Sequence, residues 1–283
     1  MFLKKKFRPL EITAKKLVDS FGTGIHLSNL KDSLIEVDGT RSYQPGDKRL
    51  DSKSSLKSGE LMSRVFNPEK DFTIFIILDI SASQYYGSDK LLKIEGGILS
   101  ALYLNYLASN SGDNVAVLTF DEEVRSLNGP AKDYGEIVNS LKNILNKTPN
   151  KGSNLNLALM NAFKLNLKNT LFFVISDFCY KLDKRAIQLM RVLSMGNNAL
   201  LSLMLVGGEE VGLKLPFSGN VIDAEGNQSC QWNFKDDMLD VHQSWEKDIV
   251  EKLSSKAKCT SVILDVDSNN FIMPLTKYFL KGS

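Results

Sequence analysis

The stretch TIFIILDISAS, residues 73–83, decides the fold. Its first six residues are β-branched or apolar without alternation, which is typical of a strand buried on both faces of a sheet. Asp79 ends this run, and Ser81 and Ser83 follow at alternate positions. Because the carboxyl ends of the strands line the ligand crevice of an open α/β sheet, we expect these three oxygen-bearing side chains to lie in that crevice.

Four later runs have the same apolar, β-branched or aromatic character, at residues 114–120, 170–177, 199–206 and 261–266. Amphipathic segments lie between the runs, at residues 90–110, 155–163, 184–194 and 241–256. Strands that alternate with helices in this way predict an α/β fold with a doubly wound, mostly parallel sheet.

Two segments depart from this alternation. Residues 1–70 are polar, basic and rich in turn signals, so we expect an N-terminal extension packed on a domain of residues 71–283. Residues 207–232 contain Gly207-Gly208, Gly219-Asn220 and Gly226-Asn227, which predict a hairpin insertion before the last helix and strand.

Composition excludes several classes of protein. With 43% hydrophobic and 24% charged residues the chain is globular, and its net charge of +2 argues against a nucleic-acid partner. No run approaches the ~20 apolar residues of a membrane span. A membrane-associated partner remains compatible with this observation. The three cysteines form neither a disulfide framework nor a C-x-x-C pair, and the N-terminus lacks a signal peptide, so we expect a cytoplasmic location.

Two further positions join the first loop as candidate ligands. Ser153 opens the helix after a Pro-containing loop, either as its N-cap or as a hydroxyl ligand, and Asp177 ends the run that starts at Thr170. If the two strands are neighbours, Asp79, Ser81, Ser83, Ser153 and Asp177 form one set of carboxylates and hydroxyls. Such hard oxygen donors suit Mg²⁺ or Mn²⁺, with Ca²⁺ as a further candidate. The alternative is a solvated turn, because Asp and Ser are also ordinary turn residues.

The same set resembles the metal-ion-dependent adhesion site of von Willebrand factor A domains. A second resemblance is to the bacterial "domain of unknown function 58" family, in which a signature precedes the A-type domain. The matching signature residues are Arg41, Tyr43, Pro45, Gly46, Asp47, Arg49 and Asp51. We expect these residues to be structural, with Asp47 and Asp51 paired with Arg41 or Arg49.

The resemblance implies a function as well as a fold. In A domains of known type the hydroxyls bind the metal directly, so Ser81 and Ser83 would be direct ligands while Asp79 and Asp177 orient waters. One metal position would stay open for a carboxylate of a partner. The implied function is a non-enzymatic, metal-dependent protein-interaction module, and the implied partner is a MoxR-type AAA+ ATPase or its client protein.

A metal-dependent hydrolase or phosphoesterase that uses the same carboxylates is the alternative. The sequence offers it little support, because the only two histidines, His26 and His242, lie in the extension and in the late helix. Neither nucleotide-binding fingerprint is present.

Overall fold

A six-stranded sheet forms the centre of the computed structural model, which describes residues 7–21, 37–45, 50–66, 72–87, 91–145, 152–180, 182–207, 218–222, 229–233 and 238–281. The strand order is β10 (Thr260–Asp265), β7 (Ala199–Val206), β6 (Thr170–Ser176), β3 (Thr73–Asp79), β4 (Asn114–Phe120) and β5 (Val124–Ala131). All neighbours pair in parallel except β5, which runs antiparallel to β4 at the edge. The mostly parallel sheet of the prediction is confirmed.

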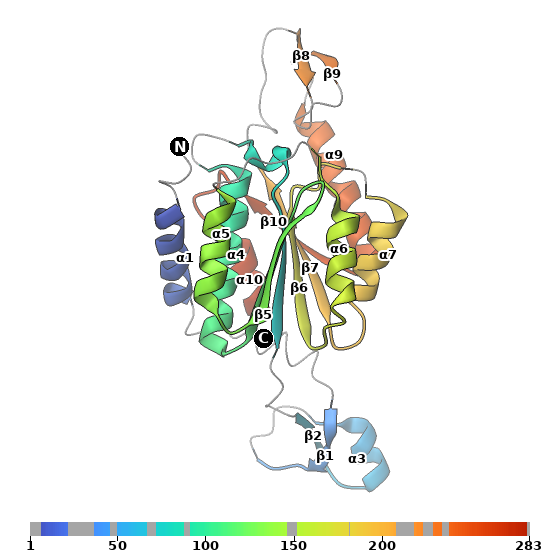
Figure 1. Cartoon of the computed structure of the whole chain (residues 1–283). Helices are drawn as coiled ribbons and strands as arrows, with labels where there is room; N and C mark the ends of the chain where they lie inside the picture. Colours follow the sequence, from blue (N-terminus) through green and yellow to red (C-terminus); the bar gives the residue numbers. More distant parts are fainter. Residues whose placement is uncertain are drawn as a thin grey trace.

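Helices cover both faces of this sheet (Figure 1). One face carries α1 (Phe7–Phe21), α4 (Lys93–Ser111), α5 (Tyr134–Ile144) and α10 (Met273–Lys281). The other carries α6 (Leu155–Lys164), α7 (Lys184–Leu193), α9 (Met238–Glu251) and the π-helical turn η3 (Lys252–Lys256) that continues α9. The fold is therefore the doubly wound α/β architecture that the sequence predicts.

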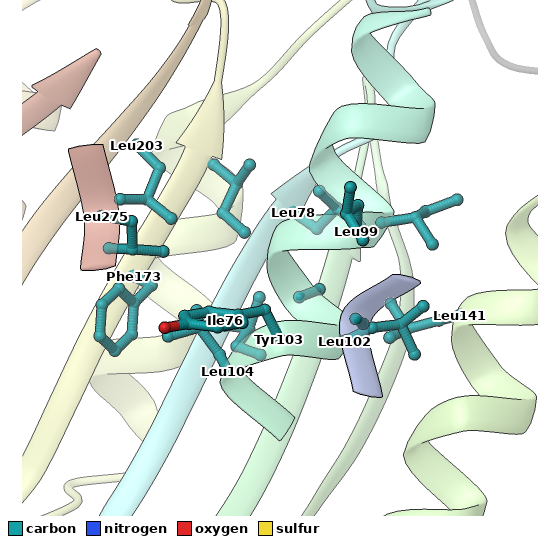
Figure 2. Close-up of a cluster of buried hydrophobic side chains, with 14 of the residues drawn as sticks. Ile76, Leu78, Leu99, Leu102, Tyr103, Leu104, Leu141, Phe173, Leu203 and Leu275 are labelled. Carbon is teal, nitrogen blue, oxygen red and sulfur yellow. The ribbon is translucent and has the colours of Figure 1, made fainter. Parts of the chain in front are cut away.

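The unbroken apolar run of β3 follows from its central position. Ile76 and Leu78 point toward α4, where they pack with residues such as Tyr103, whereas Phe75 and Ile77 belong to the cluster on the opposite face (Figure 2). Every residue of β3 is buried. A strand that contributes to two cores at once has no position left for an exposed polar side chain.

Two adjacent glycines let α4 approach the sheet closely. A Cβ atom at Gly97 would lie 2.9 Å from Leu78 Cδ1, and one at Gly96 would lie 2.8 Å from Val266 Cγ1. These distances are shorter than real Cβ contacts, so the sequence Gly96-Gly97 sets the distance between the helix and the carboxyl ends of the strands. The first turn of α4 is thereby held close to the end of β3.

Within the first 70 residues, the described ranges form two separate parts. Helix α1 packs on α4 through Phe7, Leu10, Ala14 and Val18, and the Tyr106 hydroxyl donates to a Glu11 carboxylate oxygen at 3.2 Å. Strands β1 (Val37–Ser42) and β2 (Met62–Phe66) form their own antiparallel sheet, with α3 (Ser52–Ser58) between them. This small unit lies beyond the end of the main sheet at which β3 begins (Figure 1).

The late insertion is an antiparallel hairpin, as the sequence predicts. Its strands are β8 (Ser218–Ile222) and β9 (Ser229–Asn233), and it projects from the opposite end of the molecule to the β1–β2 unit (Figure 1). Among the described residues, the helices are all too short or too polar to cross a membrane.

Candidate functional site

The candidate site lies where β3 and β6 end, side by side at the centre of the sheet. In the parallel register Leu78 pairs with Ile175, so Asp79 and Ser176 stand one residue further along. The chain leaves β3 for β4 through α4 on one face, and it reaches β6 and β7 through α6 and α7 on the other. The two strands therefore flank a topological switch point, where open α/β sheets bind their ligands.

Asp79 is the centre of a buried hydrogen-bond cluster. One carboxylate oxygen, Oδ2, accepts from the Ser176 hydroxyl at 2.8 Å and from the Ser153 hydroxyl at 3.2 Å. The other, Oδ1, accepts from the backbone N–H of Ser81 at 2.9 Å. The chain thus brings three predicted residues, Asp79, Ser81 and Ser153, together with Ser176, which the sequence analysis missed.

The loop after β3 supplies the remaining hydroxyl. Ser81 is fully buried, and its Oγ lies 3.3 Å from the Oγ of Ser83, which stands in the short 3-10 helix η2 (Ala82–Tyr85). The next residue, Gln84, is also buried, and neither its Oε1 nor its Nε2 has a hydrogen-bond partner among the described residues. A buried amide without a partner offers its polar atoms to a further polar group.

Ser153 is not the N-cap of α6, which was one of its two predicted roles. The cap is Asn154, whose side-chain oxygen accepts from the N–H of Leu157 at 3.1 Å. The Asn154 N–H in turn donates to the Asp121 carbonyl at 2.8 Å, which ties this loop to the end of β4. Because Asn154 satisfies the helix, the Ser153 hydroxyl is directed to Asp79.

Asp177 belongs to the site through a different partner. Its Oδ2 accepts from the ammonium of Lys93 at 3.1 Å, its Oδ1 accepts from the Cys179 N–H at 3.2 Å, and both side chains of the ion pair are 1% exposed. Lys93 is the first residue of α4, and the sequence analysis missed it. A buried ion pair at the ligand edge of a sheet is a costly arrangement, and it places a positive charge inside the candidate site.

The electrostatics of Asp79 reflect burial among negative charge. Burial raises the pKa of Asp79 from 3.8 to about 7, and the negative charge of Asp177 adds to the rise. Burial and the charge of Asp79 likewise raise the pKa of Tyr180, whose hydroxyl lies 3.2 Å from Ser176 Oγ. The buried charge of Asp177 thus disfavours the charged form of Asp79.

The donor chemistry fits a hard divalent cation. Asp79, Ser81, Ser83 and Ser153 offer oxygen atoms only, and a cation would offset the cost of the buried Asp79 charge. Among the described residues, no three His, Cys, Asp or Glu side chains are grouped to hold a metal, so such a cation would depend on the serine hydroxyls.

Four of the signature residues are described, and they lie in and around the β1–β2 unit, at the other end of the sheet from this site (Figure 1). Arg41 is in β1, Tyr43 and Pro45 follow it, and Asp51 caps α3 by accepting from the N–H groups of Lys53 and Ser54. The remaining signature positions, Gly46, Asp47 and Arg49, fall outside the described residues. The predicted pairing of Asp47 therefore stays a prediction.

Comparison with known families places the chain. The model of the family described as "Protein of unknown function DUF58" matches residues 39–247, which is most of the chain. The chain belongs to the DUF58 family. An uncharacterized protein of Mycobacterium tuberculosis and one of Mycobacterium bovis are each 26% identical to it over 118 residues, 41% of this chain and 37% of the relative. The match thus spans little more than a third of those relatives.

Solved structures of similar architecture include the following. BatB from Bacteroides thetaiotaomicron is 17% identical, with a TM-score of 0.47 over 75% of this DUF58 chain and 98% of its own. An aerotolerance-related membrane protein from Bacteroides fragilis is 14% identical, with a TM-score of 0.47 over 75% of this chain and 100% of its own. The VWA domain of SpRpn10 is 13% identical, with a TM-score of 0.41 over 76% and 96%.

Proposed function

We propose that this DUF58 protein is a non-enzymatic, metal-dependent protein-interaction module that captures an acidic side chain of a partner. The observation that carries the proposal is the convergence of Asp79, Ser81, Ser83 and Ser153 from two loops at the switch point of the sheet. Buried and half-buried hydroxyls gathered around one buried carboxylate, at the edge where open α/β sheets bind ligands, support a ligand-binding role.

The residues of the site would have different roles in holding a divalent cation. The hydroxyls of Ser81, Ser83 and Ser153 would hold it, Asp79 would supply negative charge, and Asp177 would add to that charge. Bound there, Mg²⁺ or Mn²⁺ would supply an electrophilic position for a carboxylate from outside. The hydroxyl-rich set leaves that position open because few carboxylates of the chain compete for it.

The partner we propose is a MoxR-type AAA+ ATPase or its client protein, as the family resemblance implies. The composition of the site supports a partner of this kind, because a cation held mainly by neutral hydroxyls keeps enough positive charge to attract an acidic side chain. The hairpin β8–β9 projects from the same end of the molecule as the site, so a partner that docks on this end would also meet the hairpin (Figure 1).

The test is binding of the purified MoxR-type ATPase from the same genome, measured with Mg²⁺ and with EDTA. We expect EDTA, Asp79→Ala and the double variant Ser81→Ala/Ser83→Ala each to weaken binding by at least about tenfold, the effect of losing one charge-assisted contact. Asp133→Ala is the control, because it removes an aspartate that caps α5 away from the site, and so tests the effect of losing a structural carboxylate elsewhere. An affinity that none of the three changes alters would refute the proposal.

The hydrolase alternative is tested separately with a generic phosphoester in the presence of Mn²⁺. We expect no turnover above that of Asp79→Ala, because in the proposed role Asp79 and the Ser153 hydroxyl that donates to it hold the cation and do not activate a nucleophile.

A further inference from the structure

The ion pair of Lys93 and Asp177 divides the candidate site into two halves. The Asp79 half gathers the hydroxyls of Ser153 and Ser176, whereas the Asp177 half is held by the Lys93 ammonium at 3.1 Å. The two halves are electrostatically coupled, because the charge of Asp177 raises the pKa of Asp79. The positive charge in the resting site is therefore a side chain of the protein itself.

The Lys93 ammonium is placed by its backbone. The Lys93 N–H donates to the Tyr86 carbonyl at 3.0 Å, and the Glu95 carboxylate accepts from the Leu92 N–H at 3.0 Å, so the first turn of α4 is fixed. Gly96 and Gly97 hold that turn against the sheet. Movement of the ammonium away from Asp177 would therefore come from a rotamer change of the flexible four-carbon stem, which is fully buried in the resting structure.

We propose that Lys93 is a built-in competitor for the divalent cation, so that the cation binds fully only when the ammonium leaves Asp177. This inference rests on the proposed function and adds a regulating residue to the same site. The reason is electrostatic: an ammonium and a divalent cation repel each other, and both draw on the charge of the same two buried carboxylates. Lys93 thereby offsets the buried charge of Asp177 and lowers the affinity for metal.

The competition couples the binding of the metal to the binding of the partner. A partner carboxylate adds negative charge beside the cation and so offsets the repulsion, whereas a metal ion alone must displace the lysine unaided. Metal and partner should therefore bind with positive cooperativity, each raising the affinity for the other by the same factor.

The test is Mn²⁺ titration by calorimetry of the wild type and Lys93→Met. We expect Lys93→Met to bind Mn²⁺ at least about tenfold more tightly, the lower end of what one neighbouring charge does to the protonation of a carboxyl group. Lys252→Met is the matched control, because Lys252 pairs with Asp248 on an exposed surface away from the site, and it should bind like the wild type. Equal affinities of wild type and Lys93→Met would refute the competition while leaving the metal site intact. No binding by either would refute the metal site of the proposed function as well.

A second measurement uses the wild type alone, because Lys93→Met leaves Asp177 without its cation and can fail to fold. Reductive methylation followed by mass spectrometry reports the exposure of each lysine ammonium. We expect saturating Mn²⁺ to raise methylation of Lys93 severalfold while leaving the exposed Lys142 unchanged. Binding of Mn²⁺ without any change at Lys93 would show that the ammonium and the metal coexist, and would overturn the proposal.

Discussion

Replacing Asp79 by Asn should make the metal-free protein more stable at neutral and alkaline pH. Burial raises the pKa of Asp79 from 3.8 to about 7, and the charge of Asp177 adds to the rise. The folded protein thus binds this proton more tightly than the unfolded chain does. The stabilisation from that proton is complete below about pH 4 and is lost as the pH rises to about 7.

The magnitude follows from the size of the shift. About three pH units at about 1.4 kcal/mol each correspond to a loss on the order of 4 kcal/mol between these limits. An Asn side chain has nearly the same shape and stays uncharged, and its amide can hydrogen-bond to the Ser81 N–H and to the hydroxyls that now contact Asp79. Asp79→Asn should therefore escape this loss.

The assay is urea unfolding in EDTA at a series of pH values from about 4 to 8. We expect the stability of the wild type to fall by several kcal/mol relative to Asp79→Asn, whereas Asp133→Asn, which alters an exposed helix cap, should follow the wild type. Excess Mg²⁺ at pH 8 should return part of the loss to the wild type, because a ligand that binds only the folded state stabilises it. Parallel curves for wild type and Asp79→Asn would refute the argument that Asp79 is buried as an uncompensated charge.

Two further predictions concern the structure around the site. Without metal, Lys93→Met should lower the free energy of unfolding by about 3–5 kcal/mol because it leaves the Asp177 carboxylate buried and unpaired, and Lys93→Met/Asp177→Asn should recover most of that loss in the same urea assay. Gly97→Ala should cost about 1–3 kcal/mol, since its Cβ would collide with Leu78, while Gly135→Ala, with only one contact at 3.5 Å, should be neutral or stabilising. Equal thermal stabilities of the two alanine variants would contradict the close-packing role of Gly97.

The central strands could be predicted from the sequence to within a residue. The runs at residues 73–79, 114–120 and 199–206 are β3, β4 and β7 without change, and residues 170–177 and 261–266 differ from β6 and β10 at one end or by one position. Strands β7, β6, β3 and β4 have neighbours on both sides and helices on both faces, so each of them has a continuous apolar run, whereas β10 lies at an edge and is only partly buried. The edge strand β5 has no such run, because it contains Asn128, Gly129 and Pro130, and the sequence analysis missed it.

Helix α1, which packs outside the first layer of helices, was also missed. Helix α1 packs mainly on α4, and it follows a basic segment with the composition of a polar tail. Its buried residues, Phe7, Leu10, Ala14 and Val18, follow helical spacing, a signal that could have revealed it.

The sequence by itself determined which residues end the central strands, and therefore that Asp79 and Asp177 stand at one edge of the sheet. It could not determine what each of them contacts. Ser176 stands at the end of a predicted strand, and the pairing of β3 with β6 brings its hydroxyl to Asp79. Lys93 stands in a predicted helix, and the packing of α4 on the sheet brings its ammonium to Asp177, 84 positions away in the chain. The pattern of apolar residues in a sequence reflects burial, because every residue of an element is either buried or exposed. The partner of a buried charge depends instead on strand register and on the face of the sheet that the connecting helix covers. Both are determined only when the elements pack together.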